Sequence, residues 1–214
     1  VISGNVSFYN ENLGENIIST PATGVVAIRS SVENIIPDSF VNNLENIILV
    51  QMNWVESWVY SDQMDNKISK FTQNQSQDVV GFIKSCTHLS EHLKQQGKKI
   101  SAIKAVGLGG VGITCLKMVR SNIGFDLSYD LSADKESDLF KDVFYGFIIS
   151  TDEDAMEIQG ELAKYFSGLN LDIKKIGETR AEEIKLSQGI SLDFKKFKEF
   201  YFRDLEQTTG GMEL

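Results

Sequence analysis

The fold is decided by residues 143–176, which read VFYGFIISTDEDAMEIQGELAKYFSGLNLDIKKI. Val143–Ile149 is an apolar run with the length of a buried strand. Asp152–Phe166 predicts a helix, because apolar residues recur in it at helical spacing. These residues are Met156, Ile158, Leu162 and Phe166. Leu171–Ile176 predicts a second strand, and a strand, a helix and a strand in succession indicate a sheet that carries helices.

The same alternation continues on both sides of this stretch. Strands are predicted over Asn46–Met52 and Ile100–Val106, and a helix over Gln77–Gln96 with Gly97 as its C-terminal cap. The apolar residues that predict this helix are Val80, Ile83, Leu89 and Leu93. The further predicted elements are a turn at Gly107–Gly112, a helix at Ile113–Ser121, a strand at Phe125–Tyr129, a short helix at Ser137–Asp142, a hairpin of Ile184–Leu186 with Ile190–Leu192, and a helix at Phe194–Leu205.

We therefore expect an α/β or α+β protein whose mixed sheet is covered by helices. Residues 1–9 and Thr23–Ile28 are predicted to be additional strands, separated by a polar turn. The segment Glu33–Leu44, around Pro37, is interpreted as a domain boundary. The chain begins with Val1 inside a β-rich run, so we expect it to be cut from a larger protein.

Composition excludes several classes of function. The chain has 214 residues, of which 42% are hydrophobic and 24% charged, and these values are typical of a globular domain. A net charge of -9 and a pI near 4.8 argue against nucleic-acid or anionic-membrane partners, while a small phosphorylated ligand is compatible. Cys86 and Cys115 are far apart in apolar surroundings, which favours a reducing cytoplasm over secretion.

A glycine motif carries one alternative function. Residues 107–112 read GLGGVG, which matches the G-x-G-x-x-G fingerprint of dinucleotide-binding folds, and Asp126 and Asp130 follow at about the distance of a ribose-binding acid. The motif lies in mid-chain with one βαβ-like unit around it. The competing interpretation is a glycine-rich turn that serves packing, and we expect no binding of NAD or a flavin there.

The remaining candidates for chemistry are few. His88 and His92 are the two histidines, spaced to share one helix face, and no third cluster of ligands completes a zinc site. A solvated or partner-facing helix surface is the favoured interpretation. Neither cysteine has the basic neighbours of a nucleophile, and two histidines offer no Ser/His/Asp triad. Hydrolytic triad chemistry is therefore not expected, and no residue of this chain is assigned as catalytic.

The first residues resemble a known family. The run VISGNVSFYNE (1–11), followed by Thr20-Pro21 and Gly24–Val26, closely resembles formylglycinamidine ribonucleotide synthase, an ATP-dependent amidine synthase of purine biosynthesis. The later segments Ala105–Val111, Ile123–Phe125, Asp130–Ser132 and Lys175–Glu178 are similar more loosely, in the family's order. The resemblance implies the last part of the second half of that enzyme, which is similar to aminoimidazole ribonucleotide synthase.

This resemblance implies a domain division and a site. Residues 1–32 would end an N-terminal domain of that type, 33–207 would form its C-terminal domain, and 208–214 a tail. Matching the family's positions, Gly4 would contact ATP, Asn5 would bind Mg²⁺, and Ser7 would bind the phosphorylated substrate. The residue chemistry agrees, since glycine allows close backbone approach and amide and hydroxyl oxygens suit a metal ion and a phosphate.

The chain also departs from the family. Where the family has a His-Asp-Val-Ser-Asp-Gly-Gly-Leu turn, this chain has Lys104–Val111, and the acidic Ser-Glu-x-x-Gly-Arg pattern has become Asp142–Phe147. Polar groups that would face a nucleotide are thus missing. We expect residues 33–207 to act as structural support, with a degenerate nucleotide site as the alternative.

By resemblance, the full enzyme transfers phosphate from ATP to the amide oxygen of formylglycinamide ribonucleotide, and glutamine-derived ammonia displaces it. The implied partners are the upstream half of the synthase, a glutaminase subunit or domain, the small-molecule substrate and a second copy of the chain. A cytoplasmic location is implied. The alternatives are a non-catalytic assembly or nucleotide-binding module and, less favoured, a dinucleotide-binding oxidoreductase domain.

Overall fold

The chain divides into two compact units, Val1–Ile35 and Ile36–Leu214. This computed structural model describes residues 11–12, 14–16, 28, 35–53, 73–127, 139–140, 145–187 and 189–209. In the first unit, β1 (Glu11–Asn12) and β2 (Glu15–Asn16) form an antiparallel hairpin. Gly14 supplies its turn with a φ of 86°. The strands predicted over residues 1–9 and 23–28 lie outside the described residues, apart from residue 28.

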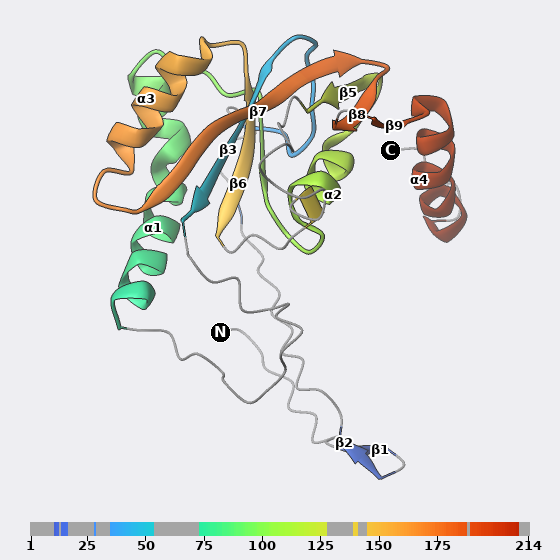
Figure 1. Cartoon of the computed structure of the whole chain (residues 1–214), viewed down its shortest axis with the longest axis horizontal. Helices are drawn as coiled ribbons and strands as arrows, with labels where there is room; N and C mark the ends of the chain where they lie inside the picture. Colours follow the sequence, from blue (N-terminus) through green and yellow to red (C-terminus); the bar gives the residue numbers. More distant parts are fainter. Residues whose placement is uncertain are drawn as a thin grey trace. The chain divides into compact units, whose positions relative to one another are not determined.

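The second unit contains a seven-stranded mixed sheet with the order β4-β6-β3-β7-β5-β8-β9 (Figure 1). The strands are β3 (Asn46–Met52), β4 (Ala102–Ala105), β5 (Ile123–Asp126), β6 (Gly146–Thr151), β7 (Leu171–Ala181), β8 (Ile184–Ser187) and β9 (Ile190–Leu192). Their pairings are antiparallel except that of β5 with β8. The predicted mixed sheet is confirmed.

The helices are α1 (Gln73–Gln95), α2 (Gly110–Met118), α3 (Ala155–Tyr165) and α4 (Phe194–Thr209). The side chains of β3 alternate between two hydrophobic cores: Ile47 and Leu49 enter one, while Ile48 and Val50 enter the other. The first core includes α2 and the start of α4, and the second includes α1 and α3, which lie side by side in Figure 1. A strand buried on both faces explains the uninterrupted apolar run at residues 47–50.

The buried face of α1 differs from the prediction. Val79 and Phe82 are buried, whereas Val80 and Ile83 are half exposed, at 50% and 49%. The predicted Leu89 and Leu93 are buried. The face that packs repeats every seven residues, through Val79, Phe82, Cys86, Leu89 and Leu93. Two adjacent apolar pairs, 79–80 and 82–83, made the sequence pattern ambiguous, and contact with α3 and the sheet selects one member of each.

In α3, Met156 is also misassigned, because it is 82% exposed while Ile158 and Leu162 are buried. The helix begins after Asp154, whose side chain accepts hydrogen bonds from the backbone N–H groups of Met156 and Glu157. Ala155, Ile158 and Leu162 recur at helical spacing on the face that packs against the core, and Met156 lies off that face. The core contacts of this helix therefore come from Ala155, Ile158 and Leu162 and not from Met156.

Several boundaries shift for local reasons. The helix predicted at 113–121 begins at Gly110 and ends at Met118, because its C-cap Val119 takes an extended conformation (φ -64°, ψ 118°). Ser121 is left-handed (φ 53°) in the turn before β5. Tyr145, also left-handed, delays the start of β6 to Gly146. At the end of α1, Gly97 acts as the predicted cap: its N–H donates to the Lys94 carbonyl, and the next N–H donates to Leu93.

Two glycines in helices should tolerate alanine with a gain in stability. A Cβ at Gly160 meets nothing within 4 Å, and one at Gly81 makes an ordinary contact of 3.6 Å with Leu169. Alanine restricts the unfolded chain, so Gly160→Ala and Gly81→Ala should each raise the unfolding free energy by about 0.5–1 kcal/mol. Urea denaturation measures this. Gly168→Ala is the control and should be destabilising, because Gly168 has a φ of 93°; a loss of stability in Gly160→Ala would contradict the assignment.

Candidate functional site

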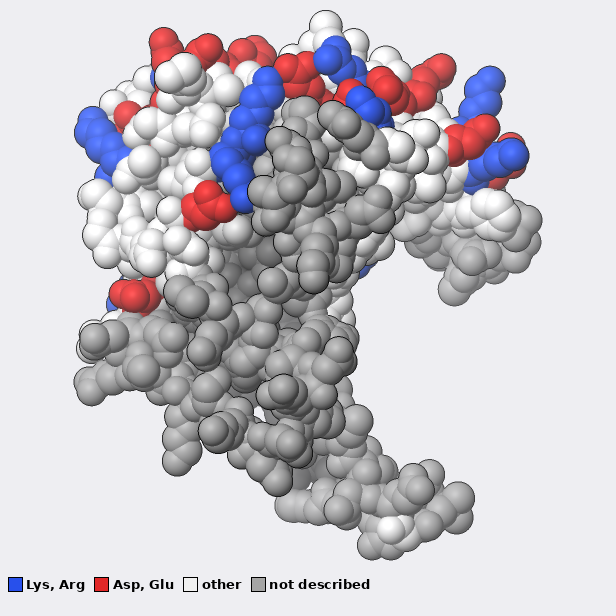
Figure 2. Space-filling view, in the orientation of Figure 1, with Lys and Arg blue, Asp and Glu red and all other residues white. Residues whose placement is uncertain are grey.

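Buried polar side chains gather at one end of the sheet, which we call the polar end. It comprises the start of β3, the start of β4, the end of β6 and the neighbouring part of β7. Its buried polar residues are Glu45, Ser101, Ser150, Thr151 and Thr179. Figure 2 shows lysine, arginine, aspartate and glutamate side chains together along the upper edge of the second unit, where β3 begins and α3 starts in Figure 1. This is the strongest candidate site in the described part of the chain.

Glu45 is the centre of the polar end, although it is only 2% exposed. Its Oε1 accepts a hydrogen bond from Asn42 Nδ2 and its Oε2 one from Ser150 Oγ, both at 2.7 Å. Its backbone N–H donates to Thr179 Oγ1 at 2.8 Å, and the Thr179 N–H donates to the Glu45 carbonyl at 2.8 Å. A buried carboxylate is costly unless it is hydrogen-bonded, and here these bonds join β3, β6 and β7.

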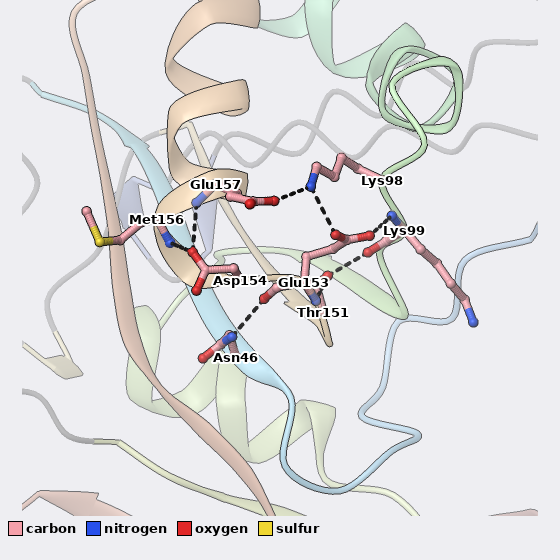
Figure 3. Close-up of polar contacts among 8 residues, drawn as sticks. All are labelled: Asn46, Lys98, Lys99, Thr151, Glu153, Asp154, Met156 and Glu157. Carbon is pink, nitrogen blue, oxygen red and sulfur yellow. Dashed lines mark hydrogen bonds and ion pairs between the residues drawn. The ribbon is translucent and has the colours of Figure 1, made fainter.

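A second network lies on the outer side of the polar end (Figure 3). Lys98 Nζ binds Glu157 at 2.6 Å and Glu153 at 3.2 Å, and these hydrogen bonds raise the pKa of Lys98 above its ordinary value. The Lys99 N–H donates to Glu153 Oε1 at 3.0 Å, and Thr151 Oγ1 donates to the Lys99 carbonyl at 2.6 Å. The segment between α1 and β4 is thereby fixed to the loop between β6 and α3.

The remaining groups of this loop are also occupied. Asn46 Nδ2 donates to the Glu153 carbonyl at 2.9 Å, and Asp154 caps α3. Each functional group of the polar end named above binds another part of the same unit. The arrangement can hold loops and strand ends in register, and among the described residues it presents no free acid and base on either side of an open cavity. In the described part of the chain, these contacts give the polar end a structural role.

The shifted pKa of one acidic group near the polar end predicts that the unfolding free energy depends on pH. The pKa of Glu178 lies below its ordinary value, chiefly because Lys175 hydrogen-bonds it at 2.7 Å, with Arg180 also at 2.7 Å. A depressed pKa contributes stability above the ordinary value of 4.5, and this contribution is lost as the pH falls through the folded-state pKa. The pairs are a third exposed, so Glu178→Gln should cost at most about 1 kcal/mol at pH 7.

Urea denaturation of Glu178→Gln and the wild type at neutral and acidic pH tests this prediction. The difference in unfolding free energy should shrink towards zero at acidic pH, where Glu178 is protonated in both states. Glu91→Gln, on the exposed side of α1, is a matched control that should show little difference at either pH. A constant difference at all pH values would contradict an electrostatic origin.

The glycine turn at 107–112 has a packing explanation. Gly109 and Gly110 have φ values of 86° and 67°. A Cβ at Gly109 would lie 2.5 Å from Ile113 Cγ1, and one at Gly112 would lie 3.0 Å from the ring of Phe140. A left-handed backbone and the contact with Ile113 thus account for glycine at 109, and the tight contact with Phe140 accounts for glycine at 112.

The sheet topology contradicts the dinucleotide interpretation. A Rossmann unit joins two parallel strands through its helix. Here β4 precedes α2 and β5 follows it, but β4 lies at one edge beside the antiparallel β6, four positions from β5. We expect calorimetry to detect no NAD binding at millimolar concentration. Micromolar binding that Gly109→Val abolished would overturn this expectation.

The histidines are placed differently from each other. His88 is exposed, as predicted. His92 is not a free helix surface: its Nε2 lies 2.8 Å from Glu161 Oε1 and its ring stacks on Tyr165, with centroids 4.2 Å apart. It therefore joins α1 to α3. The described residues contain no group of three His, Cys, Asp or Glu side chains that could hold a metal ion.

Burial makes both cysteines poorly reactive. It raises the pKa of Cys86 to about 11 and raises that of the fully buried Cys115 further. A thiol with a raised pKa is a poor nucleophile at neutral pH. Among the described residues, no helix is long and apolar enough to span a membrane.

The predicted ligand-binding residues Gly4, Asn5 and Ser7 lie outside the described residues, as does Asp130. Asp126 is described, and its Oδ2 accepts from Lys185 Nζ at 2.9 Å, so it forms an ion pair within the sheet. Sequence reasoning missed the Glu45 network. An acidic residue directly before an apolar strand was the available signal, but its partners Ser150 and Thr179 are 105 and 134 residues away.

The fold and this site define an α+β domain with a mixed sheet and a structural polar end. No family model matches the chain. Its curated relatives include the PurL subunit of phosphoribosylformylglycinamidine synthase from Methanobrevibacter smithii, 30% identical over 197 residues, which are 87% of this chain and 26% of the relative. The PurL subunit from a Sulfurovum species is 26% identical over 219 residues, which are 97% of this chain and 27% of the relative.

The solved structures with a similar fold include PurL as well. Thermotoga maritima PurL complexed with AMPPCP has a TM-score of 0.51 and 11% identity, over 76% of this chain and 27% of that one. The same protein complexed with FGAR has a TM-score of 0.52 at 11% identity, over 76% of this chain and 29% of that one. The expected fold class and the resemblance to formylglycinamidine ribonucleotide synthase are thus confirmed. The chain spans about a quarter of the length of the curated relatives it matches.

Proposed function

We propose that this chain is part of a phosphoribosylformylglycinamidine synthase, a C–N bond-forming ligase of purine biosynthesis. The observation that carries the proposal is the match to PurL over 87% of the chain at 30% identity. The similarity of the fold to PurL structures, with a TM-score of 0.51 over 76% of this chain, supports it as well. The activity belongs to the whole enzyme, of which this chain corresponds to one part.

Within that enzyme we assign the two parts of the chain different roles. Residues 33–207 support the active site, because the polar groups of the polar end are engaged with one another. Residues 1–32 complete the preceding domain, where Gly4 contacts ATP, Asn5 binds Mg²⁺ and Ser7 binds the substrate. The names of the PurL complexes with ATP and FGAR support a nucleotide and this substrate. We assign Mg²⁺ binding to residues outside the described part of the chain, because the described residues contain no metal-binding cluster.

The proposal includes further components. Ammonia would come from a glutaminase subunit or domain, and the upstream half of the synthase would supply the rest of the active site. A cytoplasmic location fits two cysteines that are both free thiols. A non-catalytic assembly module is the second candidate, and the closed hydrogen-bond network of the polar end favours it.

The test is an assay of the complete parent polypeptide with a glutaminase subunit. We expect release of ADP that requires formylglycinamide ribonucleotide, together with a product whose mass is that of the amidine. Omitting the substrate or Mg²⁺ should each abolish the signal. A folded parent protein that binds the glutaminase but releases no substrate-dependent ADP would instead establish the assembly role.

A further inference from the structure

A shallow pocket lies at the edge of the sheet where β9 leads into α4. Its volume is about 440 Å³. Its lining combines apolar and acidic side chains, which are Ile184, Leu192, Phe194, Glu182, Glu183 and Asp193. The pocket lies beside β8 and β9 at one edge of the sheet, whereas β4, β6 and β3 of the polar end lie toward the other edge. Neither the proposed function nor the family resemblance gives this pocket a role.

Hydrogen bonds hold the backbone segments that carry the three carboxylates. The Glu182 N–H donates to the Asn122 carbonyl at 2.9 Å, and the Glu183 carbonyl accepts from the backbone of β5 at 2.7 Å. Asp193 caps α4, since its Oδ1 accepts from the Lys196 N–H at 2.9 Å. The negative charge is therefore presented in a set geometry, which lowers the entropy cost of binding a cation.

Charge around the pocket is unbalanced. In the described structure no cation forms an ion pair with Glu182 or Glu183, whereas Asp126 and Glu178 on the neighbouring strands are paired with lysine or arginine. Lys195 is the one cation in the lining. A lysine or arginine side chain has an apolar stem and a charged end, which match the apolar and acidic parts of this lining.

The same place offers a strand edge. β9 is the last strand in the sheet order and hydrogen-bonds β8 on one side. No described strand lies on its other side. Ser191 and Leu192 on β9 are exposed, and Leu192, at 38%, also lines the pocket. An extended peptide can add to such an edge through main-chain hydrogen bonds, while neighbouring pockets select its side chains.

We propose that this edge binds an extended, basic segment of a partner protein. The segment adds as a strand beside β9 and places one lysine or arginine side chain in the acidic pocket. Charge complementarity selects a basic occupant, and the free edge selects an extended one. The proposal does not depend on the synthase activity, because it concerns a surface that the proposed active site does not use.

The test is binding of a labelled, end-blocked peptide, Thr-Val-Arg-Val-Thr, to the 214-residue chain, measured by fluorescence anisotropy. A peptide with Glu in place of Arg should bind at least about tenfold more weakly, since like charges would meet. Glu182→Gln with Glu183→Gln should weaken binding of the Arg peptide about five- to tenfold, as expected for two exposed charge pairs. Glu91→Gln on α1 is the matched control and should leave the affinity unchanged.

Two further measurements address the strand. Bound Arg peptide should slow amide hydrogen exchange at Ile190–Leu192, and alternate N-methylation of the peptide should abolish binding. Equal affinity of the two peptides, an equal loss in the double variant and in Glu91→Gln, or unchanged binding after N-methylation would each overturn the proposal. Concentration-dependent protection of Ile190–Leu192 without peptide would show that a second copy occupies the edge, and would also overturn it.

Discussion

Glu45→Ala is expected to lower the unfolding free energy by about 2–4 kcal/mol. The substitution leaves a cavity and removes the acceptor of Ser150, whose side chain is fully buried. Asn42 loses less, because it is exposed and can bind water. The same change should weaken the connection between β3, β6 and β7, so hydrogen exchange should accelerate at this end of the sheet before it does elsewhere.

Glu45→Gln separates charge from shape. Glutamine keeps the size and one oxygen acceptor, so the loss should be about half that of alanine. Urea unfolding followed by circular dichroism measures both variants, and Glu91→Ala on the exposed side of α1 should stay within about 0.5 kcal/mol of the wild type. If Glu45→Ala were as stable as Glu91→Ala, the buried network would not stabilise the fold.

The second large effect concerns activity and rests on the proposed function. The isolated chain should neither hydrolyse ATP nor form amidine, because it supplies at most one edge of an active site through Gly4, Asn5 and Ser7. In the complete enzyme, Asn5→Ala should lower the rate of the Mg²⁺-dependent step and Ser7→Ala should mainly raise the KM of the substrate. A hydrogen bond to a charged group contributes roughly 1.5–3 kcal/mol, so each change should be about tenfold to a hundredfold.

Steady-state assays of the chain and the complete enzyme side by side measure these effects. His88→Ala is the control, because this exposed histidine lies on α1, away from the proposed ligands in the sequence, and turnover should stay within about twofold. Turnover by the isolated chain would show that the active site has been misplaced. Normal kinetics of the Asn5→Ala variant in an active enzyme would show that Asn5 is not the metal ligand. The proposed synthase activity would still stand.

The sequence predicted elements that local chemistry specifies. The strand Asn46–Met52 is confirmed at both ends, and the hairpin of β8 and β9 turns at Gly189, whose φ is 94°. The end of α1 follows from Gly97. These features depend on periodicity and on glycine in left-handed conformations, both of which can be read within a few residues.

Features that depend on distant partners could not be predicted in this way. The choice of Val79 over Val80 requires knowledge of what α1 packs against. The hydrogen bonds of Glu45 join residues that are far apart in the sequence, and the pairing of His92 with Glu161 brings two helices together. For Gly4, Asn5 and Ser7, the family resemblance was more specific than the residue chemistry, and their assignment stays a prediction.

The position of β3 between β6 and β7 has a consequence for synthesis of the protein. Both partners of this strand lie more than about a hundred residues further along the chain, as the hydrogen bonds of Glu45 to Ser150 and Thr179 show with separations of 105 and 134 residues. A ribosome adding about 5–20 residues per second exposes the apolar strand for several seconds before either partner exists. During that interval Ile47–Val50 can pair with other nascent chains, so chaperone supply and slow translation should govern the yield of folded protein.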